Sequence, residues 1–182
     1  MRSVYSALAA LVLIPAATLL GACDDPFAGI EPQIRADSLV LSAANSNGPN
    51  PSALDIFNNA RPARPELPAQ AGSFDLQVRL TGSVFSLIPS PATGNLRGAG
   101  LQKTTRSIDD PGEAPREVAD YTREAMNVAV GETFFVQTRP GGGCGTTSKY
   151  AILKVLAADP ATGNLTVRVI SNQACDDERL EL

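Results

Sequence analysis

The chain contains no histidine among its 182 residues. Catalysis by a Ser-His-Asp or Cys-His arrangement needs an imidazole as the base, so both arrangements are excluded. Zinc, copper and haem sites that depend on histidine ligands are excluded for the same reason. We therefore expect no cofactor, and any catalytic chemistry is left to carboxylates and lysines.

Tryptophan is also absent, and phenylalanine and tyrosine together make up only 5% of the chain. A nucleic-acid-binding surface typically shows a basic patch with interleaved aromatic residues. Here the formal net charge is −4, and lysine and arginine are scattered along the sequence. We therefore expect no nucleic-acid partner.

Cysteine is scarce, and the first of the three cysteines, Cys23, directly follows a long apolar region. This region covers residues 4–20, contains no charge, and is preceded by the single charge of Arg2. A short positive start, an apolar stretch and small residues are typical of a secretory signal. The run is marginal for a membrane span, which needs roughly 20 residues. An uncleaved N-terminal anchor, or secretion with Cys23 as a free thiol, remains an alternative.

The Leu-Gly-Ala-Cys sequence that ends at Cys23 resembles the lipobox of bacterial lipoproteins. The resemblance implies cleavage before Cys23 and lipidation of that cysteine, and two or more acyl chains hold a protein stably to a membrane. It implies a signal peptide over residues 1–22 and a lipidated tether over 23–32. The expected location is the cell envelope, membrane-anchored by lipid and facing the periplasm or the exterior.

Cys144 and Cys175 remain as a pair, and we expect them to form a disulfide, since an oxidising compartment favours that bond. Between them, β-like runs at residues 149–157 and 164–171 flank a Pro- and Gly-containing turn, which predicts a hairpin. Both cysteines lie at its open end. The alternatives are two unpaired thiols or a metal pair, and two cysteines without a histidine make a poor zinc site.

From residue 73 onward the β signal is clear, and over residues 74–80 apolar residues alternate with polar ones, Asp75 among them, which is typical of a half-buried strand. One helix is expected at residues 115–126, with Pro115 in its first turn. The fold class is therefore mainly β, an antiparallel β-sandwich or barrel of about seven strands with one short helix. The strands are expected at residues 33–43, 73–80, 84–88, 96–108, 133–138, 149–157 and 164–171.

Proline is concentrated between residues 45 and 72, where it disfavours regular helix and central strand. We expect a long loop there, with an apolar patch at Leu54, Ile56 and Phe57 that docks on the core. The domain organisation is then a first strand and Pro-rich loop over 33–72, followed by a β-rich domain over 73–182.

Two further patterns have competing interpretations. The hexapeptide Pro-Ala-Thr-Gly-Asn-Leu occurs at residues 91–96 and again at 160–165. Duplicated halves or a shared ligand loop would explain it, but two turns with the same turn chemistry suffice. Acidic clusters allow a glycosidase or a calcium site in principle, although solvated surface turns are the simpler interpretation. These clusters are Asp24-Asp25, Asp109-Asp110 and Asp176-Asp177-Glu178.

The last third of the chain, through residues 131–138, 149–155 and 165–169, resembles the HmuY-like lipoproteins in its strand patterning. These are β-rich surface proteins, some of which bind haem. The resemblance implies a β-rich fold. It does not transfer the ligand, since this chain has no histidine to receive haem.

The sequence favours a non-catalytic binding or interaction role, with the membrane contacted through the lipid and an envelope protein or small ligand as partner. The competing hypotheses are a hydrolase acting on envelope glycans through carboxylates such as Asp109 and Asp176, and a structural spacer.

Replacing the proposed lipid site, Cys23→Ala, should release the protein from membranes, because the acyl chains are attached to that sulfur. Cell fractionation and metabolic labelling with a radioactive fatty acid measure this. Cys144→Ala is the matched control and should stay membrane-bound and labelled. Continued lipid labelling of Cys23→Ala would refute the anchor.

Overall fold

The computed structural model describes residues 31–44 and 48–181, which belong to one compact unit. The predicted signal peptide, Cys23 and the tether as far as residue 30 lie outside the described residues. Within them, no helix is long and apolar enough to cross a membrane.

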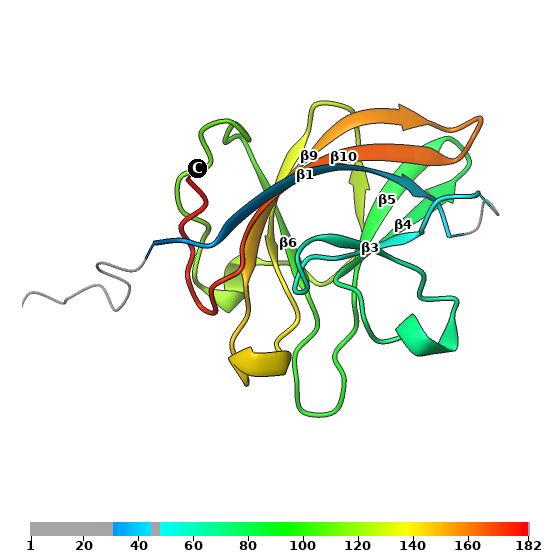
Figure 1. Ribbon diagram of the computed structural model, residues 1–182. Helices are drawn as coiled ribbons and strands as arrows, with labels where there is room; N and C mark the ends of the chain where they lie inside the picture. Colours follow the sequence, from blue (N-terminus) through cyan, green and yellow to red (C-terminus); the bar gives the residue numbers. More distant parts are fainter. Residues whose placement is uncertain (1–30, 45–47, 182) are drawn as a thin grey trace, which may run out of the picture. The chain divides into compact units, whose positions relative to one another are not determined.

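The described part of the chain folds into ten strands in two five-stranded sheets, all paired antiparallel (Figure 1). Sheet A has the order β1-β10-β9-β8-β6 and sheet B the order β3-β2-β4-β5-β7. This is a β-sandwich, as the sequence predicts. The strands are β1 (Ile34–Ser42), β2 (Ala53–Asp55), β3 (Arg61–Ala63), β4 (Leu76–Thr81), β5 (Val84–Pro89), β6 (Gly100–Thr104), β7 (Met126–Val128), β8 (Thr133–Gln137), β9 (Tyr150–Asp159) and β10 (Asn164–Asn172).

The main hydrophobic core lies between the two sheets and follows from the alternation of side chains along each strand. In β8, Phe134 and Val136 belong to this core, whereas Phe135 faces the other way, as predicted. Sheet B contributes Leu76, Val78 and other apolar side chains to the same cluster. The predicted hairpins β4-β5 and β9-β10 both form.

Part of the outer face of sheet A is also buried, which explains why β8 is buried along its whole length. A second apolar cluster covers it, in which the segment 105–124 and the C-terminal segment 173–181 supply Ile108, Tyr121 and Leu180. These two segments run side by side, green and red in Figure 1, and the Leu180 amide donates to the Gly112 carbonyl.

The prediction of a helix at residues 115–126 is wrong. The region contains one 3₁₀ turn, η2 (Val118–Asp120), followed by the strand β7. Tyr121 is buried on the outer face of sheet A, whereas Met126 pairs with Leu87 in sheet B. Because the chain must pass from one sheet to the other within a few residues, it is extended, and tertiary contacts override the helical spacing.

The Pro-rich segment 45–72 is more regular than the predicted loop. It contains β2, β3 and a 3₁₀ turn, η1 (Pro68–Gln70). Pro62 lies in β3, at the edge of sheet B, where a missing N–H is tolerated. The docking of the apolar patch is confirmed, since Leu54 and Ile56 are fully buried and Phe57 is nearly so. The short strands β2, β3 and β7 are the three strands that the periodicity of the sequence does not predict.

The repeated hexapeptide forms two different turns. In the first copy Thr93 and Leu96 pair across a tight turn with Gly94 at φ 59°. In the second copy Gly163, at φ 71°, closes the β9-β10 hairpin, where the Asp159 carboxylate accepts from the Ala161 amide. Shared turn chemistry, not a shared ligand loop, describes what the two copies have in common.

A buried ion cluster joins the two sheets at one end of the sandwich. Asp75, expected on the polar side of its strand, is fully buried. Its carboxylate accepts from the amides of Phe57 (2.8 Å) and Arg139 (2.9 Å) and pairs with the Arg139 guanidinium. Burial raises the pKa of Asp75 above its ordinary value, and Arg139 opposes that rise. Arg139 also pairs with Asp55 in β2, at 3.0 Å.

Asp75→Asn should lower the free energy of unfolding by about 3 kcal/mol, because it removes one of the two acids that compensate the largely buried Arg139. Guanidinium chloride unfolding measures the loss. Asp110→Asn is the matched control and should change stability by no more than about 0.5 kcal/mol, since Asp110 is exposed. Equal effects of the two substitutions would contradict the structural role of Asp75.

Candidate ligand-binding cleft

An open cleft of about 830 Å³ lies above the outer face of sheet A. Its volume is within the range of small-molecule sites. The lining comes from four separate parts of the chain, and polar groups from each converge on it. The lining residues are Arg97, Arg116, Glu117, Val118, Ala119, Tyr121, Arg123, Thr146, Thr147, Tyr150 and Asp176.

The floor of the cleft contains two buried tyrosines, Tyr121 and Tyr150, whose ring centroids are 6.5 Å apart. The Tyr121 hydroxyl donates to the Pro115 carbonyl at 2.6 Å. Burial raises the pKa of both phenols above their ordinary value, so both stay protonated at physiological pH. The floor is therefore uncharged.

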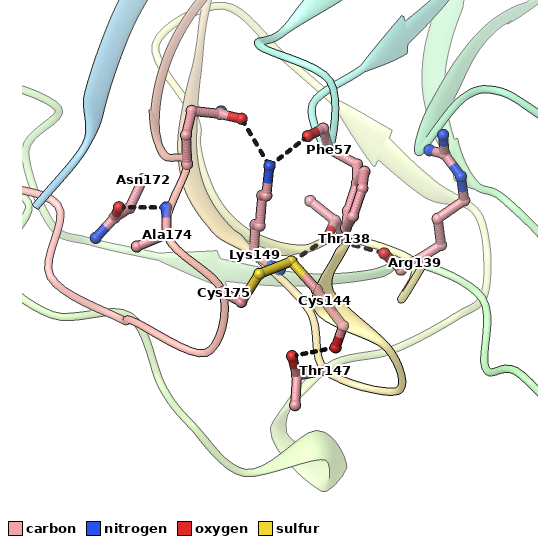
Figure 2. The surroundings of a disulfide bond; sticks show 10 residues. Phe57, Thr138, Arg139, Cys144, Thr147, Lys149, Asn172, Ala174 and Cys175 are labelled. Atoms are coloured by element: carbon pink, nitrogen blue, oxygen red, sulfur yellow. Dashed lines mark hydrogen bonds between the residues drawn. A yellow bond between two sulfur atoms is a disulfide. The ribbon is translucent and has the colours of Figure 1, made fainter. Parts of the chain in front are cut away.

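Cys144 and Cys175 lie close in sequence to Thr147 and Asp176, which line the cleft. Figure 2 shows the bond between the two cysteine sulfur atoms. The two cysteines lie at disulfide distance, with their Cα atoms 5.4 Å apart, beyond the open end of the β9-β10 hairpin as predicted. The Thr147 hydroxyl donates to the Cys144 carbonyl, and the amide of Asp176 donates to the Ser148 carbonyl. The disulfide thus holds Thr147 and Asp176, which line the cleft from two segments, next to each other.

Behind the disulfide, the ring of Phe57 is packed between cations. The Lys149 ammonium lies 4.5 Å from the ring centroid and the Arg139 guanidinium 5.8 Å from it. Figure 2 shows Lys149 reaching the Phe57 carbonyl, at 2.9 Å. Burial lowers the pKa of Lys149, and Asp55 opposes this. Gly142 has φ +52°, and a Cβ there would lie 2.9 Å from the ring, so the loop needs glycine at this position.

Three arginines line the cleft, and each has a different environment. Arg116 pairs with Asp176 at 3.0 Å and with Glu178 at 3.2 Å. The charge of Glu178, followed by the hydrogen bond to Asp176, raises the pKa of Arg116. Arg97 donates to the Ser148 hydroxyl at 3.1 Å, and Arg123 is exposed.

A close backbone approach holds Arg97 in place. A Cβ on the next residue, Gly98, would lie 2.1 Å from the Ser90 carbonyl oxygen, so only glycine fits. The amide of Ala99 also donates to that carbonyl, at 3.1 Å. The segment that carries Arg97 is therefore fixed by its backbone, not only by the contact with Ser148.

The acidic clusters do not come together. Asp109 pairs with Arg168 and lines, with Asp110 and Glu181, a separate cavity of about 360 Å³. Asp176 lies in the cleft, and Asp177 is buried and pairs with Arg179 at 2.8 Å. Asp24-Asp25 lies outside the described residues. Over residues 31–44 and 48–181, no group of three or more Cys, Asp or Glu side chains is placed to hold a metal ion.

Sequence reasoning found only one part of this cleft, the cysteine pair and the acid that follows it. It assigned Tyr121 to a helix and gave no role to Arg97 or Arg123. No sequence motif links Tyr121, Arg97 and Arg123. They lie on irregular segments that come together only through their packing over sheet A. The close backbone approach at Gly98 has no signature in the sequence either.

No known protein family, curated protein or solved structure matches this chain.

Cys144→Ser with Cys175→Ser should destabilise the domain by about 3 to 4 kcal/mol, since the bond closes a loop between residues 31 positions apart. Guanidinium unfolding with and without reductant measures this, and reduced wild type should match the double variant. Intact mass should show the oxidised protein lighter by two hydrogens. Alkylation of both thiols in the folded, unreduced protein would contradict the disulfide.

Proposed function

We propose that this protein is a lipid-anchored, extracytoplasmic binding protein that holds a small ligand, without turning it over, in the cleft. The observation that carries the proposal is the convergence of arginine, tyrosine, threonine and aspartate side chains from four segments on one concavity beside the disulfide. Concave sites with a few convergent polar groups are the usual form of ligand sites.

The ionisation states of the lining groups favour binding over proton transfer. The two tyrosines stay protonated because burial raises the pKa of each. Asp176 is held by Arg116. A general base must be free to accept a proton, and this role is not favoured for the protonated tyrosines or for Asp176, which is engaged in an ion pair.

The arrangement of the acids gives less support to the glycan hydrolase hypothesis. A glycosidase places two carboxyl groups within roughly 5 to 10 Å on either side of one bond. Asp109 and Asp176 line different cavities, and each pairs with its own arginine. Binding is therefore the function that the geometry supports best.

The extracytoplasmic location is proposed from the lipobox resemblance together with the cysteine pair. Cys144 and Cys175 lie at disulfide distance, and structural disulfides persist mainly in oxidising compartments. A tether that starts at Cys23 would leave the cleft outside the cytoplasm.

Screening a library of small metabolites by ligand-observed NMR, with protein purified in mild detergent, tests the cleft. Ala119→Trp fills the cleft, since Ala119 is exposed and lines it. Ligands should lose at least about tenfold in affinity for this variant, because the indole occupies their volume. They should also be recovered chemically unchanged.

Ala157→Trp is the matched control, because Ala157 is exposed on β9 and does not line the cleft. It should bind like the wild type. If no compound distinguishes the two variants, or if bound compounds are converted to products, the proposed function is wrong.

A further inference from the structure

We propose that the ligand of the cleft is a small organic anion, bound through carboxylate or phosphate groups by Arg97 and Arg123. This inference rests on the proposed function and adds the chemical class of the ligand.

Arg97 is the first reason, since its charge is incompletely compensated. The side chain is half-buried, and its Nε is buried without a hydrogen-bond partner. Its one hydrogen bond goes to the neutral hydroxyl of Ser148, and among the described residues it forms no ion pair with an acid. A partly desolvated cation is costly unless a counter-charge is nearby, and an anion in the cleft would supply that charge.

Arg97 is also held rigidly. Ser148 is fully buried, and its hydroxyl donates to the Thr138 carbonyl at 2.6 Å, which directs the oxygen lone pairs toward the guanidinium. A preorganised group loses little side-chain entropy when a ligand binds. The position of Arg97 is thus set before the ligand arrives.

Arg123 supplies a second cation at the cleft. It is exposed, and no ion pair or hydrogen bond engages its guanidinium in the part of the chain that the structure describes. The acids of the lining are Glu117, which is exposed, and Asp176, which is already engaged by Arg116. Of the three arginines that line the cleft, Arg97 and Arg123 are the two without an acid partner among the described residues, so they are the cations left to bind an anion.

Guanidinium groups suit this ligand class. Their planar donors match the two oxygens of a carboxylate or phosphate, and hydrogen bonds between charged groups are stronger than neutral ones. Arg116, whose ion pairs with Asp176 and Glu178 occupy two of its nitrogens, acts as a positioning residue for the wall beside the disulfide. The volume of about 830 Å³ leaves room for a molecule larger than a single inorganic ion.

Isothermal titration of the detergent-purified chain with citrate, pyrophosphate and uncharged trehalose tests this assignment. At least one of the two anions should bind saturably, and salt at about 150 mM should weaken the binding by screening. Citrate alone indicates a carboxylate ligand and pyrophosphate alone a phosphate ligand. Arg97→Gln and Arg123→Gln should each weaken the affinity about tenfold.

Arg79→Gln is the matched control, since Arg79 is exposed on β4 in sheet B and the substitution removes the same charge. It should leave the affinity unchanged. Arg123→Gln keeps the test valid if Arg97→Gln fails to fold, because Arg123 is exposed and no ion pair or hydrogen bond engages its guanidinium among the described residues.

Failure of both anions to bind at millimolar concentration, or equal weakening by all three substitutions, overturns the anion assignment. The proposed function survives that result if neutral compounds still distinguish Ala119→Trp from Ala157→Trp. It fails separately if no compound of either charge does so.

Discussion

The ion cluster around the buried carboxylate of Asp75 is the interaction on which the arrangement of the cleft end of the sandwich depends. Asp75 lies immediately before β4 in sheet B, yet its partners are Phe57, after β2, and Arg139, after β8 in sheet A. An unpaired buried charge costs free energy, so removing one of these three segments from the cluster would destabilise the other two. One acid thereby joins the two sheets and determines where the loop after β8 begins.

That loop carries Cys144. The ion cluster therefore also determines where the disulfide lies, and with it the adjoining side of the cleft. Phe57, positioned by Asp75, packs against Gly142 and under Lys149, and the disulfide then joins the loop to the segment that follows β10. Each of these contacts is short-range and leaves the contacting groups little conformational freedom. A cleft built from irregular segments can be rigid in this way, because the segments are held by buried polar contacts and not by a regular ladder.

The sandwich itself was largely predictable, because period-two alternation reports directly on which face of a strand is buried. The strand around Phe134 was found on that signal, and the strands around Leu153 and Val167 were found as β-like runs on either side of a Pro- and Gly-containing turn. The elements that were missed are three residues long, too short to show a period, or lie where the chain passes between the sheets. The predicted helix failed because its apolar residues are buried in two different places, at Tyr121 and at Met126.

The sequence by itself determined the fold class, the cysteine pairing at disulfide distance, and the absence of histidine chemistry. Each of these depends on composition or on neighbours along a strand. The tertiary structure alone decided that Asp75 is buried, that the acidic clusters lie apart, and that Arg97 and Arg123 line one cleft. The physical reason is that burial and charge compensation are properties of packing between distant segments, and nothing local in the sequence records which segments will meet.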